Sequence, residues 1–186
     1  MKRLQIGVMG SAEDLKYSKE TLKFAQRIGE LIAQKDAILV FGAEKDMDSL
    51  SSAAARLAKM NGGITVGITY GKGQDIWDKD EPTIIIPCGL ERGGGREFTL
   101  ALACDAVIAI AGGSGTLTEM VVAYQANIPI VALTGLGGWS EKMADKYFDE
   151  RKHKKCVTAT TPEEAVDLAV KLAREVRNEY LHSKEY

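Results

Sequence analysis

Histidine and cysteine, the residues that build most transition-metal and redox sites, are scarce in this sequence. Its 186 residues include two histidines and three cysteines, and Cys88, Cys104 and Cys156 are too widely spaced to form a C-x-x-C pair. His153 and His182 both lie among charged residues near the C-terminus. We therefore expect reduced, mostly buried cysteines, and neither a metal ion nor a histidine-based catalytic triad.

Long apolar runs and an excess of either charge are also missing. No apolar stretch reaches the roughly 18 residues that a membrane-spanning helix needs, and Met1-Lys2-Arg3 leads into a predicted strand instead of a signal peptide. The 24 lysines and arginines nearly balance the 26 aspartates and glutamates, giving a net charge of −2. This balance provides no basic surface for nucleic acid. We expect a cytoplasmic protein that binds neither nucleic acid nor a membrane.

Short apolar runs alternate with segments of helical periodicity. The predicted strands are residues 4–9, 37–41, 64–68, 83–86, 106–111, 128–133 and 155–158. The predicted helices are the segment around Leu22, Ala25, Ile28 and Ile32, and residues 49–60, 96–103, 116–126 and 161–180. Strands that are apolar throughout indicate a parallel sheet covered on both faces. The sequence thus predicts a single Rossmann-like α/β domain, residues 1–186, with a doubly wound, mostly parallel seven-stranded sheet between helical layers.

Three loops of this fold are the expected places for a ligand, because ligands bind beyond the carboxyl ends of the strands where the winding direction reverses. These loops are Gly10-Ser11, residues 91–96 and residues 112–116. The first lacks the G-x-G-x-x-G continuation of dinucleotide-binding proteins, which argues against an NAD enzyme. In the third, Gly115 is followed by Thr116-Leu117 and not by Lys-Ser/Thr, which argues against a P-loop ATPase.

The third loop reads Ala-Gly-Gly-Ser-Gly-Thr-Leu-Thr-Glu over residues 111–119. Its glycines have no Cβ, so an anion can approach the bare backbone, and a helix beginning near Thr116 would direct free N–H groups at that anion. Glu119, in the first turn of the helix, would lie beside it. Thr116-Leu117-Thr118-Glu119 is also a capping box, which is a purely structural alternative. We expect a phosphate to bind here, at Gly10, Ser11, Gly112, Gly113, Ser114, Gly115 and Thr116.

Arg96 follows three consecutive glycines at the start of a predicted helix. A positive charge is mildly unfavourable at a helix N-terminus. A bound phosphate or carboxylate would remove that penalty and suits the geometry of a guanidinium group. We therefore interpret Arg96 as a ligand-binding residue, with a solvated helix start as the alternative, and Arg92 as solvated or at most an auxiliary contact.

Arg96 together with residues 111–119 resembles the LOG family of nucleoside 5′-monophosphate phosphoribohydrolases, long mislabelled as lysine decarboxylases. The signature of that family is P-G-G-x-G-T-x-x-E, preceded by an arginine fifteen positions before the proline. Here Ala111 replaces the proline, Arg96 stands fifteen positions before it, and Asp105 also fits the family pattern.

The resemblance implies cleavage of the N-glycosidic bond of a nucleoside monophosphate, without a metal or redox cofactor. Arg96 and Glu119 match the positions regarded as catalytic, and the glycine loop would hold the phosphate. A carboxylate beside the ribose can stabilise an oxocarbenium-like transition state. The resemblance also implies a homodimer formed through helices next to the site, which here suggests the apolar helix around Phe98, Leu100 and Leu102.

The chain departs from the LOG pattern elsewhere. The family's glycine-rich run after the second strand is replaced by residues 42–50, which contain one glycine and add Glu44, Asp46 and Asp48. Gly94-Gly95 replace a His-Glu pair, and Glu97 replaces a lysine. These changes are similar to those of a divergent branch that includes molybdenum-cofactor carrier-like proteins.

Two functions therefore stay open: a nucleotide-cleaving hydrolase, or a non-catalytic carrier or sensor of a nucleotide-like or molybdopterin-like phosphate. A true lysine decarboxylase is disfavoured, because no lysine lies in a recognisable pyridoxal-phosphate context.

Overall fold

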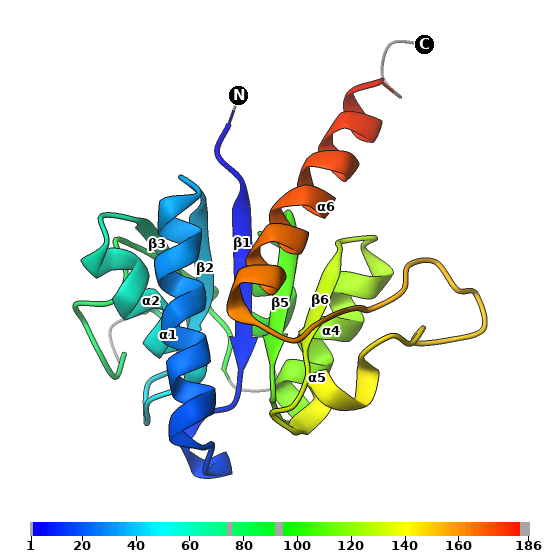
Figure 1. Cartoon of the computed structure of the whole chain (residues 1–186). Coiled ribbons are helices and arrows are strands. Elements are labelled where there is room, and N and C mark those ends of the chain that lie inside the picture. Colours follow the sequence, from blue (N-terminus) through cyan, green and yellow to red (C-terminus); the bar gives the residue numbers. More distant parts are fainter. Residues whose placement is uncertain (1, 74–75, 92–94, 183–186) are drawn as a thin grey trace.

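The computed structural model describes residues 2–73, 76–91 and 95–182. In this part of the chain, seven strands form one parallel sheet in the order β4-β3-β2-β1-β5-β6-β7 (Figure 1). The strands are β1 (Gln5–Gly10), β2 (Ile38–Ala43), β3 (Ile64–Thr69), β4 (Ile84–Pro87), β5 (Ala106–Ile110), β6 (Ile130–Leu133) and β7 (Val157–Ala159). The chain winds outward from β1 to β4 and then returns to β5 on the other side of β1. The predicted Rossmann-like fold is confirmed, and its winding direction reverses between β1 and β5.

Helices cover both faces of this sheet. They are α1 (Lys19–Gln34), α2 (Leu50–Met60), α3 (Arg96–Leu102), α4 (Ser114–Gln125), α5 (Gly138–Met143) and α6 (Pro162–His182), with a short 3-10 turn, η1 (Glu13–Leu15), after β1. One apolar core joins the sheet to α1, α2 and α6 through residues such as Ile28, Leu50 and Val166. A second core joins the opposite face to α3 and α4 through Leu100 and Met120. Strand β5, next to the central strand β1, is buried at every residue because it lies between these two cores.

Strand β4 is less covered than the other strands of the sheet. This strand lies at the edge of the sheet, and Ile84, Ile85 and Ile86 are 47%, 41% and 41% exposed. The long connection before β4 contains no helix in its described residues, as its irregular sequence predicts. The outer edge of the sheet on the β4 side is therefore apolar and open.

The predicted element boundaries agree closely with the structure, since every strand begins and ends within two residues of its prediction. The last helix begins at Pro162, and Thr161 Oγ1 accepts a hydrogen bond from the Glu164 N–H at 3.2 Å, as the capping pattern predicts. Two short elements, η1 and α5, were not predicted because neither has enough residues to show a helical period. None of the helices in the described ranges combines the length and apolarity needed to cross a membrane.

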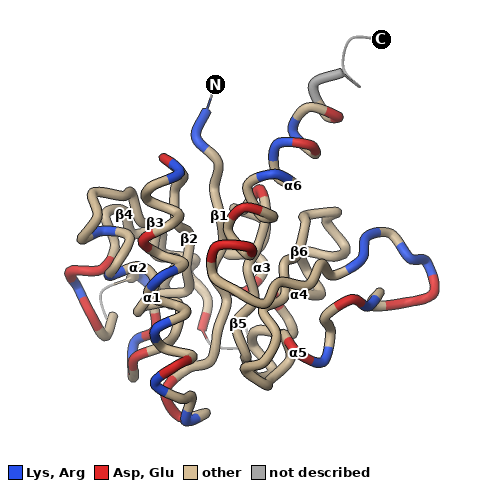
Figure 2. Tube along the Cα trace, viewed as in Figure 1, with Lys and Arg blue, Asp and Glu red and all other residues tan. Residues whose placement is uncertain are grey.

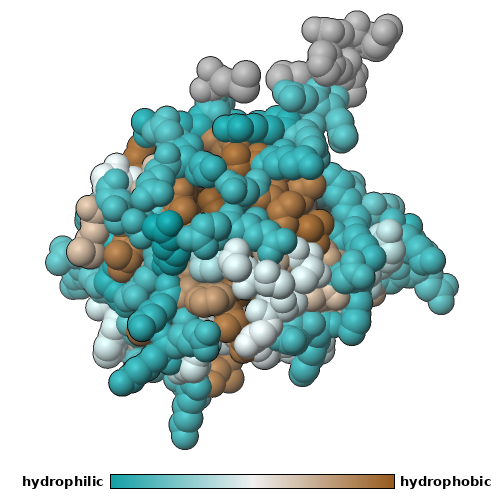
Figure 3. Space-filling model, in the orientation of Figure 1, coloured by the Kyte–Doolittle hydropathy of each residue, from teal (hydrophilic) through white to brown (hydrophobic). Residues whose placement is uncertain are grey.

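The surface carries both charges in mixture. Figure 2 shows lysines and arginines interspersed with aspartates and glutamates along the helices and the long loop before β7. On the face that carries α1 and α6, hydrophilic side chains cover most of the surface, and hydrophobic residues show between the two helices (Figure 3). The mixture of charges on the surface agrees with the nearly equal numbers of acidic and basic residues in the sequence.

Candidate functional site

Two loops meet where the sheet reverses its winding, one after β1 and one after β5. The Gly112 N–H donates to Ser11 Oγ at 2.9 Å, and Thr116 Oγ1 donates to the Gly10 carbonyl at 3.4 Å. Gly112 has φ +91, and a Cβ there would lie 2.5 Å from the Thr116 side chain, so only glycine fits. Ser11 and Gly112, both predicted to contact phosphate, thus bond to each other and hold the two loops together.

The backbone of the β5 loop differs from what the LOG motif allows. Ala111, which replaces the proline of the motif, has φ 51. The proline ring fixes φ near −65°, so proline cannot take this conformation. The carbonyl groups of Ala111 and Gly112 accept hydrogen bonds from the N–H groups of Ser140 and Trp139, at 2.9 and 3.0 Å, at the start of α5. The substitution at Ala111 therefore accompanies a change in the shape of the loop.

Helix α4 begins earlier than the sequence suggests. Its first residue is Ser114 and its N-cap is Gly113, which makes no side-chain capping hydrogen bond. The predicted helix start near Thr116 and the placement of Glu119 in the first turn are both wrong, and the capping-box alternative is not formed, since Glu119 lies in the second turn. The N–H groups of the first turn have no intrahelical acceptors. The start of α4 is consequently available to an anion.

A cavity of about 450 Å³ opens in front of this helix start. Its volume is in the range of pockets that bind small molecules. Seven of the nine predicted site residues line it: Gly10, Arg96, Gly113, Ser114, Gly115, Thr116 and Glu119. Ser11 and Gly112 line a neighbouring cavity instead. Apart from its neighbours in the chain and the backbone of α4, no heavy atom lies within 4 Å of the position that a Cβ on Gly115 would take, so the helix start faces open space.

Arg96 is buried in the wall of this cavity, with 5% of its surface exposed. Its Nη1 lies 2.9 Å from Glu44 Oε1 and its Nη2 lies 3.9 Å from Glu119 Oε1. The guanidinium carbon lies 4.3 Å from the centroid of the Tyr70 ring. Its Nε has no hydrogen-bond acceptor among the described residues. Arg96 therefore keeps a buried Nε–H that no described protein group accepts, while its Nη1 forms the ion pair with Glu44.

The acid–base state of Glu119 follows from its burial. The pKa of this carboxyl group is raised to about 8, chiefly because the group is removed from water; Arg96 lowers the pKa, and the neighbouring Glu97 and Glu44 raise it. Burial lowers the pKa of Arg96, but the nearby Glu44, Tyr70 and Glu119 outweigh it and the pKa is raised overall. At neutral pH the cavity thus presents a guanidinium cation beside a mostly protonated carboxyl group.

Two functional candidates, Glu44 and Tyr70, were not predicted as site residues. Glu44 follows β2, and the sequence indicates only that it adds negative charge near a ligand. In the structure it forms an ion pair with Arg96. Tyr70 comes directly after β3, so its place at the carboxyl edge of the sheet was the available signal. Arg92 lies outside the described residues, and within the described ranges no three His, Cys, Asp or Glu side chains are placed to hold a metal ion.

The model of the SLOG cluster4 family matches residues 3–166 of this chain. The chain belongs to the SLOG cluster4 family. An uncharacterised protein of Archaeoglobus fulgidus is 34% identical over 133 residues, which cover 72% of this chain and 82% of that protein. These matches confirm the predicted kinship with LOG-like Rossmann proteins.

Several solved structures share the fold of this SLOG cluster4 protein. TM1055, a structural-genomics target, has a TM-score of 0.80 at 25% identity, over 90% of this chain and 99% of that one. The molybdenum cofactor binding protein of Rippkaea orientalis has a TM-score of 0.76 at 27% identity, over 92% and 98%. The molybdenum cofactor carrier protein of Chlamydomonas reinhardtii has a TM-score of 0.77 at 26% identity, over 93% and 99%. The chain is thus similar to the molybdenum-cofactor carrier-like branch that the departures from the LOG pattern indicate.

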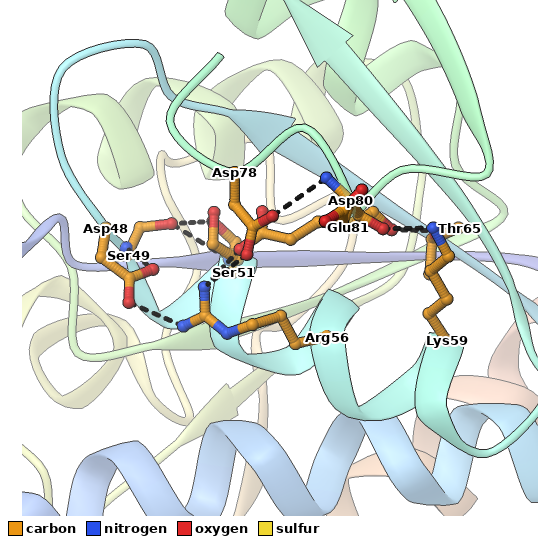
Figure 4. A network of polar contacts seen from close by, with 10 residues as sticks. Asp48, Ser49, Ser51, Arg56, Lys59, Thr65, Asp78, Asp80 and Glu81 are labelled. Atoms are coloured by element: carbon orange, nitrogen blue, oxygen red, sulfur yellow. Dashed lines mark hydrogen bonds and ion pairs between the residues drawn. The ribbon is translucent and has the colours of Figure 1, made fainter.

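In this SLOG cluster4 protein, a network of ion pairs orders the segment that carries Glu44. Arg56 on α2 pairs with Asp48 at 2.6 Å and Asp78 at 3.6 Å, and also with Glu81 (Figure 4). The Trp77 N–H donates to the Glu44 carbonyl at 2.8 Å. The network therefore joins the segment after β2 to the irregular connection before β4, and fixes the backbone from which Glu44 reaches Arg96.

Proposed function

We propose that this protein binds a phosphorylated, nucleotide-like small molecule, with its phosphate on the first turn of α4. One observation carries this proposal: the turn has no side-chain cap and opens, at Gly115, into a cavity. Free N–H groups and the helix dipole favour an anion at such a position. The family membership and the likeness to a molybdenum cofactor binding protein and a carrier protein support this class of ligand.

Arg96 would provide the second contact to the ligand. Its side chain lines the cavity, with the guanidinium group between Glu44 and Glu119. A polar group of the ligand that reaches this wall of the cavity would contact the guanidinium group. Because Glu44 already neutralises much of the Arg96 charge, this contact suits a neutral polar group better than a second phosphate. The ligand would therefore lie with its phosphate at α4 and its sugar or heterocycle at Arg96.

The protonation of Glu119 favours binding without turnover. Cleavage of a glycosidic bond needs an ionised carboxylate near the developing oxocarbenium ion. Burial raises the pKa of Glu119 to about 8, so this carboxyl group is mostly neutral at pH 7. A neutral carboxyl group donates a hydrogen bond to a ligand but stabilises little positive charge. We therefore propose a non-catalytic carrier or sensor of a nucleotide-like or molybdopterin-like phosphate, acting in the cytoplasm.

A phosphoribohydrolase is the second candidate. Arg96 and Glu119 occupy the two positions that the LOG resemblance assigns to catalysis, and their side chains face each other at 3.9 Å across the cavity wall. In this case Glu119 would act only once ionised. Release of free base would then rise as the pH approaches and passes 8.

A binding and product assay separates these functions. Nucleoside 5′-monophosphates are added to the protein, binding is measured by thermal shift and calorimetry, and free base is measured by chromatography. We expect at least one of them to raise the melting temperature without release of base at pH 7. Glu119→Gln should keep the affinity within about threefold, since an amide replaces a neutral carboxyl group of nearly the same shape.

The exposed Glu150→Gln variant is the matched control. Base release by the wild type that disappears in Glu119→Gln, but not in Glu150→Gln, would establish the hydrolase in place of the carrier. Absence of any thermal shift and any measurable heat with all the monophosphates would contradict the binding proposal itself.

A further inference from the structure

A second cavity, of about 500 Å³, lies on the other side of the glycine loop. It opens between the loops that follow β1, β5 and β6. Its lining includes Ser11 and Gly112, the two predicted phosphate residues that do not face the first cavity. The binding mode proposed above leaves this space unused.

The two cavities share one thin wall, because Leu15 and Gly113 line both of them. Leu15 belongs to η1 and is 53% exposed. A Cβ on Gly113 would lie 2.8 Å from Leu15 Cδ1, so the leucine side chain packs directly against the bare backbone. A ligand that follows the backbone at Gly113 from one cavity to the other would have to displace the exposed Leu15 side chain.

The side chains of the second cavity suit a phosphate and an aromatic ring. Lys16 and Lys142 line it, and Glu20 is the one acid among its described lining residues. Trp139 contributes an indole ring, with Lys142 Nζ 4.6 Å from the ring centroid. Lysine binds phosphate as a compact point charge, and an indole ring can stack on a nucleobase. The first cavity differs, because its cation is paired with Glu44 and its anion contact comes from the backbone of α4.

We infer that the ligand of this protein has two phosphate-bearing units, as in a dinucleoside diphosphate. One unit would occupy the first cavity with its phosphate on α4. The other would cross the wall at Gly113 and bind Lys16 and Lys142 through its phosphate and Trp139 through its base. This inference rests on the proposed function, because it specifies the ligand class of the same site.

Calorimetry with matched pairs of ligands tests the inference. AMP, GMP, CMP and UMP are each compared with the corresponding symmetric P1,P2-dinucleoside 5′-diphosphate. For the preferred base, the dinucleotide should bind at least about tenfold more tightly than the monophosphate, because the second unit binds at high effective concentration. The Lys16→Ala/Lys142→Ala variant should lose most of this advantage. Lys146→Ala, an exposed lysine outside the cavity, should keep it.

Fluorescence gives a readout confined to the second cavity. The chain has two tryptophans, so Trp139 is the sole indole in a Trp77→Phe variant. Dinucleotide should quench its emission and monophosphate should leave it unchanged, as only the former brings a base to Trp139.

The outcomes are distinguishable. If monophosphate and dinucleotide bind equally well, or if the lysine variant keeps the tighter binding of the dinucleotide, the inference is overturned while the proposed function stands. If neither kind of ligand binds, both fail. Tighter dinucleotide binding that depends on the two lysines and quenches Trp139 supports both.

Discussion

Two glycines line the first cavity, and the space around their Cβ positions differs. A Cβ on Gly42 would lie 2.8 Å from Arg96 Nη1, so this glycine makes room for the buried guanidinium. Gly115 has no neighbour within 4 Å of its Cβ position and leaves room for something that the chain does not itself provide. At the scale of single residues, Gly42 therefore makes room for Arg96, whereas the space at Gly115 stays open toward the cavity.

Substitution of Gly115 by alanine should separate binding from stability. Alanine favours the helical conformation over glycine by about 1 kcal/mol, and the added methyl group meets no atom within 4 Å beyond its chain neighbours and the backbone of α4. We expect unchanged or slightly raised resistance to urea, together with at least about tenfold weaker binding of the nucleoside monophosphate measured by calorimetry. A variant that loses stability, or one that binds as tightly as wild type, would show that the start of α4 is not the phosphate site.

At the scale of elements, α3 has one buried and one exposed apolar face. Leu100 is 1% exposed and packs in the core, whereas Phe98 and Leu102, one helical turn apart, are 54% and 58% exposed. Phe98 also lines the first cavity. Of the three residues that the sequence suggests for a dimer, Leu100 is therefore engaged within the chain and the other two are available to a partner.

We expect a homodimer in which α3 of each protomer covers Phe98 and Leu102. Light scattering coupled to size exclusion should give twice the 20.1 kDa chain mass for the wild type. Phe98→Ser/Leu102→Ser should shift it toward the monomer, since two exposed apolar side chains would be lost from the interface. Met60→Ser removes a side chain that is 79% exposed on α2 and should leave the mass unchanged. A wild-type monomer, or a serine variant of undiminished mass, would refute the dimer.

At the scale of the whole molecule, two buried acids link stability to pH. Burial raises the pKa of Glu119 from 4.5 to about 8 and that of Glu81, despite its pairing with Arg56, to about 7. The folded protein therefore holds protons that the unfolded chain releases above about pH 4.5. The stabilisation is fully present below that pH and is lost as the pH rises through 7 and 8.

Urea unfolding at several pH values between 5 and 8 should reveal this linkage. We expect the free energy of unfolding of the wild type to fall across the range by a few kcal/mol, since one unit of pKa difference corresponds to about 1.4 kcal/mol. Glu119→Gln removes the larger of the two shifts and should flatten the curve, and Glu150→Gln should retain the wild-type slope. Equal slopes in all three proteins would show that Glu119 is not buried as a neutral group.

The apolar and glycine patterns predicted most of the helices and strands, because these elements depend on interactions between residues close together in the sequence. Uniformly apolar runs, as in Ala106–Ile110, are required where a strand is covered on both faces. The pattern at Thr161 and Pro162 fixed the start of α6, since it depends on adjacent residues alone. The same reasoning failed at α4. A Thr-x-x-Glu motif is a capping box only if the helix begins there, and the hydrogen bonds of the β5 loop to Ser11 and α5 place the start at Ser114.

The sequence by itself determined the strands, the helices and the doubly wound class of the fold, and from that class the edge of the sheet where a ligand is expected, because periodicity and capping depend on neighbours along the chain. Only the tertiary structure decided the chemistry at that edge. It brought Glu44 and Tyr70 from separate loops to Arg96 and buried Glu119. It also divided the predicted phosphate loop between two cavities. These outcomes depend on distances between residues far apart in sequence and on exclusion of water, and no local pattern encodes either.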